Sequence, residues 1–136
     1  QAGKRLCRSL EWEAACRGPE GRRHSYGDTL TPGRCYTEGA RSFDDRDLKP
    51  IGGFPDCTTP GGVRDLDGGV SEWVEEAHPG PAFPQDEGPA ERPTHVLRGG
   101  TMWTARYGQD CLSRHWHSVG HRQEDDGFRC CSDPIP

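Results

Sequence analysis

The sequence is poor in apolar side chains, which make up 30% of its 136 residues and give a mean hydropathy of −0.95. We therefore expect no large apolar core.

No stretch approaches the run of about 18 apolar residues that a membrane-spanning helix needs. A basic stripe is also missing, since the formal charge is −5 and the isoelectric point is near 5.6, so nucleic acid is not an expected partner. Gln1 is not a start methionine and no signal peptide precedes it, so we expect a processed chain or a fragment.

The cysteines lack the paired short spacings of a zinc site, because the one close pair, Cys130–Cys131, is too tight for a zinc knuckle. Seven cysteines beside 19 glycines and 12 prolines instead indicate a loop-rich domain held by disulfides, each contributing about 2–4 kcal/mol of stability. Disulfides persist in oxidising compartments, so we expect an extracytoplasmic protein: periplasmic, on the cell surface or secreted. The odd count leaves one cysteine free or bonded outside this chain.

One short helix is indicated by clear start and stop signals. Ser9 precedes residues 10–17, an acidic residue lies early in that stretch, and Arg17 lies late. Gly18-Pro19 then ends the helix.

Two short strands are indicated elsewhere. Residues 70–74 alternate with one face apolar apart from Glu72, and residues 95–98 form a second candidate that ends at a glycine pair. We interpret residues 18–62 as ordered loops with short strands, and residues 78–93, rich in proline, glycine and acids, as an exposed loop.

Four segments then fall in an order that resembles a known family. They are Gly-Lys-Arg-Leu followed by Glu-Trp-Glu-Ala-Ala-Cys-Arg-Gly within residues 3–18, the run at 65–73, Val-Leu-Arg-Gly-Gly-Thr at 96–101, and Gly-Phe-Arg-Cys at 127–130. They resemble the GKRLPTEAEWEYACRG, DMxGNVWEW, VLRGGSW and GFRC segments of the formylglycine-generating enzymes, the sulfatase-modifying factor family. The resemblance implies that residues 1–136 are the C-terminal portion of a single domain. It also implies an irregular, loop-rich α+β variant of the C-type lectin-like fold, with short strands, one clear helix and disulfides.

Several residues of these segments are expected to be structural. Trp12 and Trp73 should anchor the core, because large aromatic side chains dominate the area that a small domain buries. Gly99-Gly100 should mark a place where the backbone passes close to another segment or adopts a positive φ. Glu72 and Arg129 are fixed within the fold in this family, as the resemblance implies.

The resemblance also implies that the family's chemistry is missing. Members use two cysteines, between the Gly-Gly-Ser strand and the next structural cysteine, to hold copper(I) and engage the substrate cysteine with oxygen. Residues 101–110 occupy that interval and contain no cysteine, while Cys111 matches the structural cysteine. Copper(I) requires soft thiolate ligands, so we expect no catalytic residue here.

Calcium is the family's other inorganic component, bound by oxygens that include asparagine side chains. Gly69 and Tyr36 stand where those asparagines are expected, and the chain contains no asparagine. A site made by Asp67 and Glu72, with backbone carbonyls of residues 68–70, is possible in principle because calcium accepts such hard oxygen ligands. We expect no other cofactor.

His115, His117 and His121 lie outside the family pattern. A His-x-His pair on a strand places both rings on one face, and a third histidine four residues later could complete a zinc site with an open position. The alternative, which we favour, is three exposed loop histidines beside Arg114 and Arg122.

The disulfide pairing follows from the resemblance and from loop closure. The resemblance implies a Cys16–Cys111 bridge. Closing the polar loop between Cys35 and Cys57 would contribute about 3 kcal/mol, so we predict that pair as well. The family joins its Gly-Phe-Arg-Cys cysteine to one upstream of Gly-Lys-Arg-Leu, a position that falls before Gln1. Adjacent strand residues point to opposite faces, so Cys7 can bond only one of Cys130 and Cys131 without strain. We choose Cys131 for Cys7 and leave Cys130 for the absent upstream cysteine.

Two functions compete at this point. The first is a non-catalytic extracytoplasmic binding or structural module, whose ligand is a protein, a glycan or a partner subunit. Aromatic side chains give large contact area at low entropic cost, which makes a set in the 101–126 segment the candidate contacts: Trp103, Tyr107, His115, Trp116 and His117. The second is a divergent sulfatase-modifying cysteine oxidase, or a copper or non-haem iron relative that forms carbon–sulfur bonds. Those iron relatives draw their histidines from a separate upstream domain.

Overall fold

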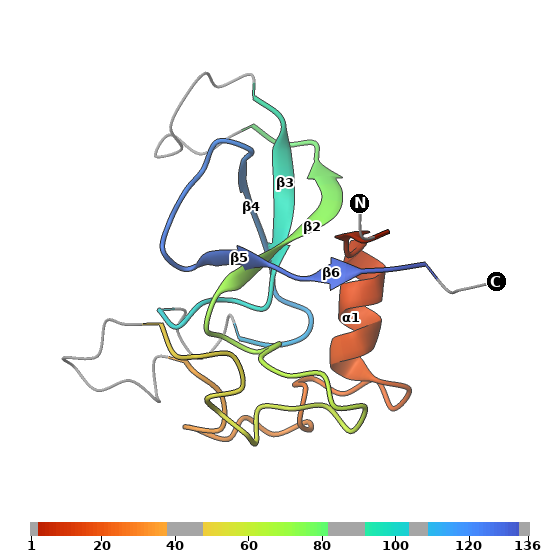
Figure 1. The fold of residues 1–136 in the computed structure, drawn as a ribbon, viewed down its shortest axis with the longest axis vertical. Coiled ribbons are helices and arrows are strands. Elements are labelled where there is room, and N and C mark those ends of the chain that lie inside the picture. The colour runs from red at the N-terminus through yellow and green to blue at the C-terminus, as the bar shows by residue number, and fades with distance from the viewer. Residues whose placement is uncertain (1–2, 38–47, 82–91, 104–108, 134–136) are drawn as a thin grey trace.

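The structure is a computed structural model, and it describes residues 3–37, 48–81, 92–103 and 109–133. Loops make up most of these ranges, around one helix and a curled sheet (Figure 1). The elements, in chain order, are β1 (Arg5–Leu6), α1 (Ser9–Arg17), β2 (Ser71–His78), β3 (Thr94–Arg98), β4 (Arg114–Ser118), β5 (Asp126–Phe128) and β6 (Cys130–Cys131). No helix within the described ranges is long and apolar enough to cross a membrane.

Helix α1 forms where the sequence predicts it, with a cap one residue earlier. Ser9 is the first helical residue and Arg8 is the N-cap. The Glu11 carboxylate accepts a hydrogen bond from the Arg8 backbone N–H at 2.8 Å. This N–H has no acceptor within the helix, so the acidic residue of the first turn supplies one. Trp12 and Cys16, four residues apart, lie on one face and are buried against the sheet.

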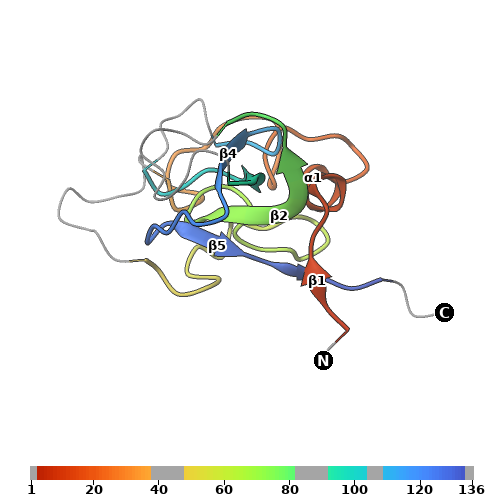
Figure 2. The same cartoon turned by 90° about the horizontal axis from the view of Figure 1, so that it is seen from above.

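The main sheet has the strand order β4-β3-β2-β5. β2 pairs antiparallel with β3, and β3 with β4, whereas β5 lies parallel to β2. The predicted strands at 70–74 and 95–98 fall in β2 and β3, but β2 continues to His78, so the loop predicted from that residue begins later. Seen from above, α1 lies beside β2 (Figure 2), and β6 runs back to pair with β1 next to the start of the helix.

The core is small and lies between α1 and the sheet. Its buried members include Trp12, Leu66, Val74 and Val96 together with cysteine side chains. Trp12 is 1% exposed, as predicted for an anchor, whereas Trp73 is half-buried and contributes less. The Arg98 guanidinium is fully buried, where it lies over the Trp12 ring and pairs with Glu13 at 2.8 Å. An ion pair thus completes a core that apolar residues alone do not fill.

Three disulfides tie this core to the loops, and they are the three pairs expected from the sequence. Cys7–Cys131 and Cys16–Cys111 join residues 124 and 95 positions apart, and Cys35–Cys57 closes a loop of separation 22. Cys130 is exposed and unbonded within this chain. Long covalent links of this kind compensate for the scarcity of apolar side chains.

Candidate functional site

The interval that carries the family's chemistry follows β3 and the Gly99-Gly100 pair. Met102 is fully buried and its backbone N–H donates to Gly69 at 2.9 Å, so it packs rather than faces a ligand. Trp103 is 43% exposed. Residues 104–108, including the predicted contact Tyr107, lie outside the described ranges. Because residues 101–110 contain no cysteine and six of the seven cysteines are in disulfides, this interval offers copper(I) no thiolate.

The histidines of the C-terminal segment form one cluster, and they are not the exposed loop residues that we favoured from the sequence. His115 and His117 lie on β4 with ring centroids 5.7 Å apart. The His117 ring stacks on that of His121 at 3.7 Å, and His121 is 9% exposed. Pairing of β4 with β3 turns this polar stretch into a strand and draws the rings together.

Two aspartates border the histidine cluster. The His121 Nε2 atom lies 3.6 Å from the Asp126 carboxylate, and Asp125 is buried. Burial, reinforced by the nearby charges of His117 and His121, lowers the pKa of His115 to about 4. Burial likewise raises the pKa of Asp126. Burial therefore favours the neutral forms of His115 and Asp126.

The cluster does not gather its nitrogens as a zinc site does. Across the described ranges, one set of three residues has ligand atoms that all lie within 4.8 Å of one another, and it is Cys16, Asp67 and Cys111. Binding zinc through His115, His117 and His121 would thus require the rings to turn from their stacked arrangement.

The three predicted contact residues on β4 fall on its two faces. Trp116 points away from the two neighbouring histidines, as alternation along a strand requires, and stacks on His78 of β2 at 3.9 Å. Trp103 lines a shallow hollow of about 340 Å³ together with Gln123, Glu124 and Asp125. Asp125 also influences the pKa of His115, so Trp103 and the histidine cluster border the same acidic loop.

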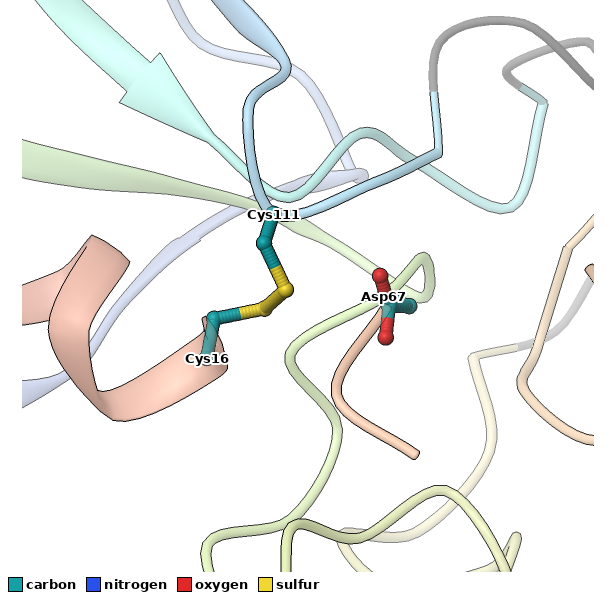
Figure 3. Close-up of side chains that lie close together, drawn as sticks. All are labelled: Cys16, Asp67 and Cys111. Carbon is teal, nitrogen blue, oxygen red and sulfur yellow. A yellow bond between two sulfur atoms is a disulfide. The ribbon is translucent and has the colours of Figure 1, made fainter. Parts of the chain in front are cut away.

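Asp67, one of the two predicted calcium ligands, is buried beside the Cys16–Cys111 bridge (Figure 3). Its carboxylate accepts the Ser25 backbone N–H at 2.7 Å and lies 3.6 Å from Nδ1 of His24. Both sulfurs of this group are in the disulfide, so neither is a thiolate ligand.

Glu72, the other predicted calcium ligand, is 5% exposed and is held by different partners. It accepts the Trp12 indole N–H at 2.6 Å, and both of its oxygens pair with the Arg129 guanidinium. A calcium site made by Asp67 and Glu72 together would require Arg129 to leave this carboxylate. The structural role expected for Glu72 and Arg129 matches these contacts.

Asp67 and Glu72 also help to line a pocket of about 330 Å³ that the sequence interpretation missed. Aromatic and aliphatic side chains from distant segments form its walls, among them Tyr36, Ile51, Phe54, Val70 and Phe128. The available signal was the group of three large apolar side chains, Leu48, Ile51 and Phe54, in an otherwise polar, turn-rich region.

The helix, the curled mixed sheet and the disulfides define an α+β domain of the formylglycine-generating-enzyme type. The family model of the sulfatase-modifying factor enzyme 1-like domain matches residues 1–134, and the chain belongs to this family.

Relatives of known sequence agree with this assignment. The chain is 27% identical to the formylglycine-generating enzyme of Bos taurus over 99% of its length and 40% of the enzyme's. It is 30% identical to that of Streptomyces coelicolor, over 97% of the chain and 48% of the enzyme. It is 31% identical to the serine/threonine-protein kinase pkn1 of Chlamydia caviae, over 94% of the chain and 21% of the kinase.

Solved structures show the same fold. Treponema denticola variable protein 1 superposes with a TM-score of 0.75 at 28% identity, over 96% of the chain and 48% of that protein. CarF superposes with a TM-score of 0.69 at 20% identity, over 93% of the chain and 46% of CarF, a likeness of fold alone. The chain therefore spans about half the length, or less, of the relatives it matches.

Proposed function

We propose that this chain is a non-catalytic, extracytoplasmic binding or structural module built on the formylglycine-generating-enzyme fold. The observation that carries the proposal is the missing thiolate pair. Residues 101–110 contain no cysteine, and the one unbonded cysteine, Cys130, lies on β6 rather than in that interval. Hydroxyl or amide groups in place of the thiolates do not bind copper(I) as thiolates do, and the one thioether of the interval, Met102, is fully buried.

Features of the frame support a binding role. Disulfides and buried ion pairs hold the loops in place. Binding through these loops therefore costs little additional conformational entropy of the backbone. Trp103 is exposed and is suited to contacts with a protein, a glycan or a partner subunit, to which the half-buried Trp116 and β4 histidines could add. In Chlamydia caviae pkn1, the matching region is about a fifth of a protein named as a kinase, which fits an accessory module within a longer chain.

Three disulfides also support an oxidising location outside the cytoplasm.

Calcium at Asp67 stays part of the proposal, because one buried oxygen of this carboxylate has no hydrogen-bond donor among the described residues. The competing function is cysteine oxidation, which the similarity to formylglycine-generating enzymes favours.

Copper(I) affinity separates the two functions. In a titration against a chromophoric copper(I) chelator under anaerobic conditions, the chain should fail to withdraw copper, with the Streptomyces coelicolor formylglycine-generating enzyme titrated beside it for comparison. Because Cys130 is exposed, a Cys130→Ser variant is measured in parallel to remove adventitious binding by that thiol. Withdrawal of one equivalent of copper by Cys130→Ser would contradict the proposal.

A further inference from the structure

A pocket lined in part by Phe128 has mainly apolar walls. Tyr36 and Phe54 stack at 5.3 Å in its lining, to which Val70 and Phe128 also belong. Its volume of about 330 Å³ lies near the lower end of the range of about 300–1,000 Å³ that ligand pockets span. It is large enough for one bulky side chain rather than an extended cofactor.

The mouth of this pocket carries large hydrophobic side chains in contact with water. Leu48 is 46% exposed, Ile51 is 97% exposed and Phe128 is 67% exposed. A small molecule enclosed in the pocket would leave these three side chains hydrated. A protein surface that extends past the mouth covers them, and exposed apolar groups gathered around a concave site mark such surfaces.

The wall that carries Ile51 is held in place before any ligand arrives. The Gly52 backbone N–H donates to the Asp65 carboxylate at 2.6 Å, and Cys57 at the end of the wall is bonded to Cys35 beside Tyr36. Asp65 has a φ of 57°, a left-handed conformation uncommon for a residue with a side chain. Strained residues persist where surrounding contacts fix them, and they concentrate at binding sites.

The charges of the lining are arranged by depth. At the base, Asp67 and Glu72 are buried, and the Glu72 carboxylate is neutralised by Arg129. At the mouth, the exposed charged residues of the lining are Lys49 and Arg64, both cationic. An apolar group is therefore accepted inside, and acidic groups are favoured around it.

We propose that this pocket docks a partner protein through a bulky apolar side chain flanked by acidic residues. The inference deepens the proposed binding function by naming a site and a ligand chemistry. The apolar side chain fills the space between Phe54 and Val70, and the flanking carboxylates lie near Lys49 and Arg64.

Peptides of defined sequence test this chemistry on the whole chain. The probe is acetyl-Gly-Asp-Phe-Asp-Gly-amide, with acetyl-Gly-Lys-Phe-Lys-Gly-amide and acetyl-Gly-Asp-Ala-Asp-Gly-amide as comparisons. Amide chemical shifts in ¹⁵N-labelled protein should change saturably with the first peptide, and the changes should centre on Ile51, Phe54, Val70 and Phe128. The two comparison peptides should bind at least tenfold more weakly.

Two exposed variants locate the binding without risking the fold. Ile51→Asp and Phe128→Asp should each weaken binding of the acidic peptide at least tenfold, while Leu112→Asp, which changes a half-exposed side chain outside the lining, should leave it unchanged. The inference is overturned by absence of saturable shifts, by shifts centred elsewhere, or by equal binding of the lysine peptide. Any of these results leaves the copper(I) titration unaffected, so failure of this site and failure of the non-catalytic proposal are distinguishable.

Discussion

Glu72 is the residue on which helix, sheet and C-terminal strand converge. Its carboxylate joins the Trp12 indole of α1 to the Arg129 guanidinium between β5 and β6. Arg129 also donates to the backbone carbonyls of Arg64 and Asp65 at the pocket. One buried carboxylate thus positions the core tryptophan and the base of the pocket together.

Replacement of Glu72 by alanine should therefore be severe. It leaves the buried Trp12 N–H without an acceptor and Arg129 without its counter-ion, and loss of one partner of a buried pair costs about 3–5 kcal/mol. We expect the lower part of that range in urea unfolding, because Arg129 retains some contact with solvent. Glu75→Ala, at an exposed carboxylate on the same strand, is the control and should cost less than about 1 kcal/mol. Equal losses in the two variants would refute this role for Glu72.

His115 gives the molecule a predictable response to acid. Burial lowers its folded-state pKa to about 4, from about 6.5 in the unfolded chain. The unfolded state then binds more protons between these values, so stability is retained above pH 6.5 and declines as the pH falls towards 4. By linkage, about 2 kcal/mol is lost between pH 7 and pH 5.

Between pH 7 and pH 5, the free energy of unfolding of a His115→Gln variant should fall by about 2 kcal/mol less than that of the parent chain. The measurement is urea unfolding of both proteins at pH 5 and pH 7, with the difference between the two pH values as the readout. Asp125, His117 and His121 surround position 115 in both proteins, so the comparison isolates the imidazole of His115. Identical pH dependence in the two proteins would show that His115 is not held neutral by burial.

At the scale of elements, the sequence predicts what local signals determine. α1 has an acid in its first turn, Arg17 in its last and Gly18 after it, and the structure forms it within one residue of the predicted bounds. The apolar faces of residues 70–74 and 95–98 identify β2 and β3 for the same reason. The disulfide pairs follow from the family resemblance and loop closure, and the structure contains them.

β4 and the pocket depend on tertiary contacts that local pattern does not encode. Residues 114–118 are mostly polar, and they form a strand because they pair with the edge of β3. The tendency of a segment to form a strand depends on such neighbours as well as on its own sequence. The pocket wall at residues 48–54 is positioned by the Asp65 carboxylate and the Cys35–Cys57 bridge, both distant in sequence. The clustering of the histidines follows from the same strand pairing, and it corresponds to the less favoured of the two interpretations of the sequence.

The disulfides should contribute unequally. Removing Cys16–Cys111 with paired alanines opens a long loop between α1 and β4, with an expected loss of about 4–5 kcal/mol in the chain-entropy treatment, against about 3 kcal/mol for Cys35–Cys57. The control is Cys130→Ser at the exposed cysteine, expected within about 0.5 kcal/mol of the parent chain. Urea unfolding at neutral pH gives all three values. A greater loss from the Cys35–Cys57 variant would contradict the account.

At the scale of the whole molecule, the family's fold is kept while its metal-binding thiols are missing. Motifs at 3–18, 65–73, 96–101 and 127–130 build the helix, the sheet and the closing strand, so they are retained for architecture. The described part of the 101–110 interval, residues 101–103 and 109–110, belongs to none of these elements. Function can thus differ from that of relatives at 27–30% identity without any change of fold.

The decisive measurement is conversion of a cysteine to formylglycine. The chain is incubated with copper(I), oxygen and a sulfatase-type cysteine peptide, and the peptide mass is measured by mass spectrometry. The Streptomyces coelicolor formylglycine-generating enzyme is the positive control. Because residues 101–110 supply no thiolate, we predict that the peptide mass stays unchanged while the control converts it fully. Repeated turnover by this chain, with the mass decrease that accompanies oxidation of a thiol to an aldehyde, would contradict the account.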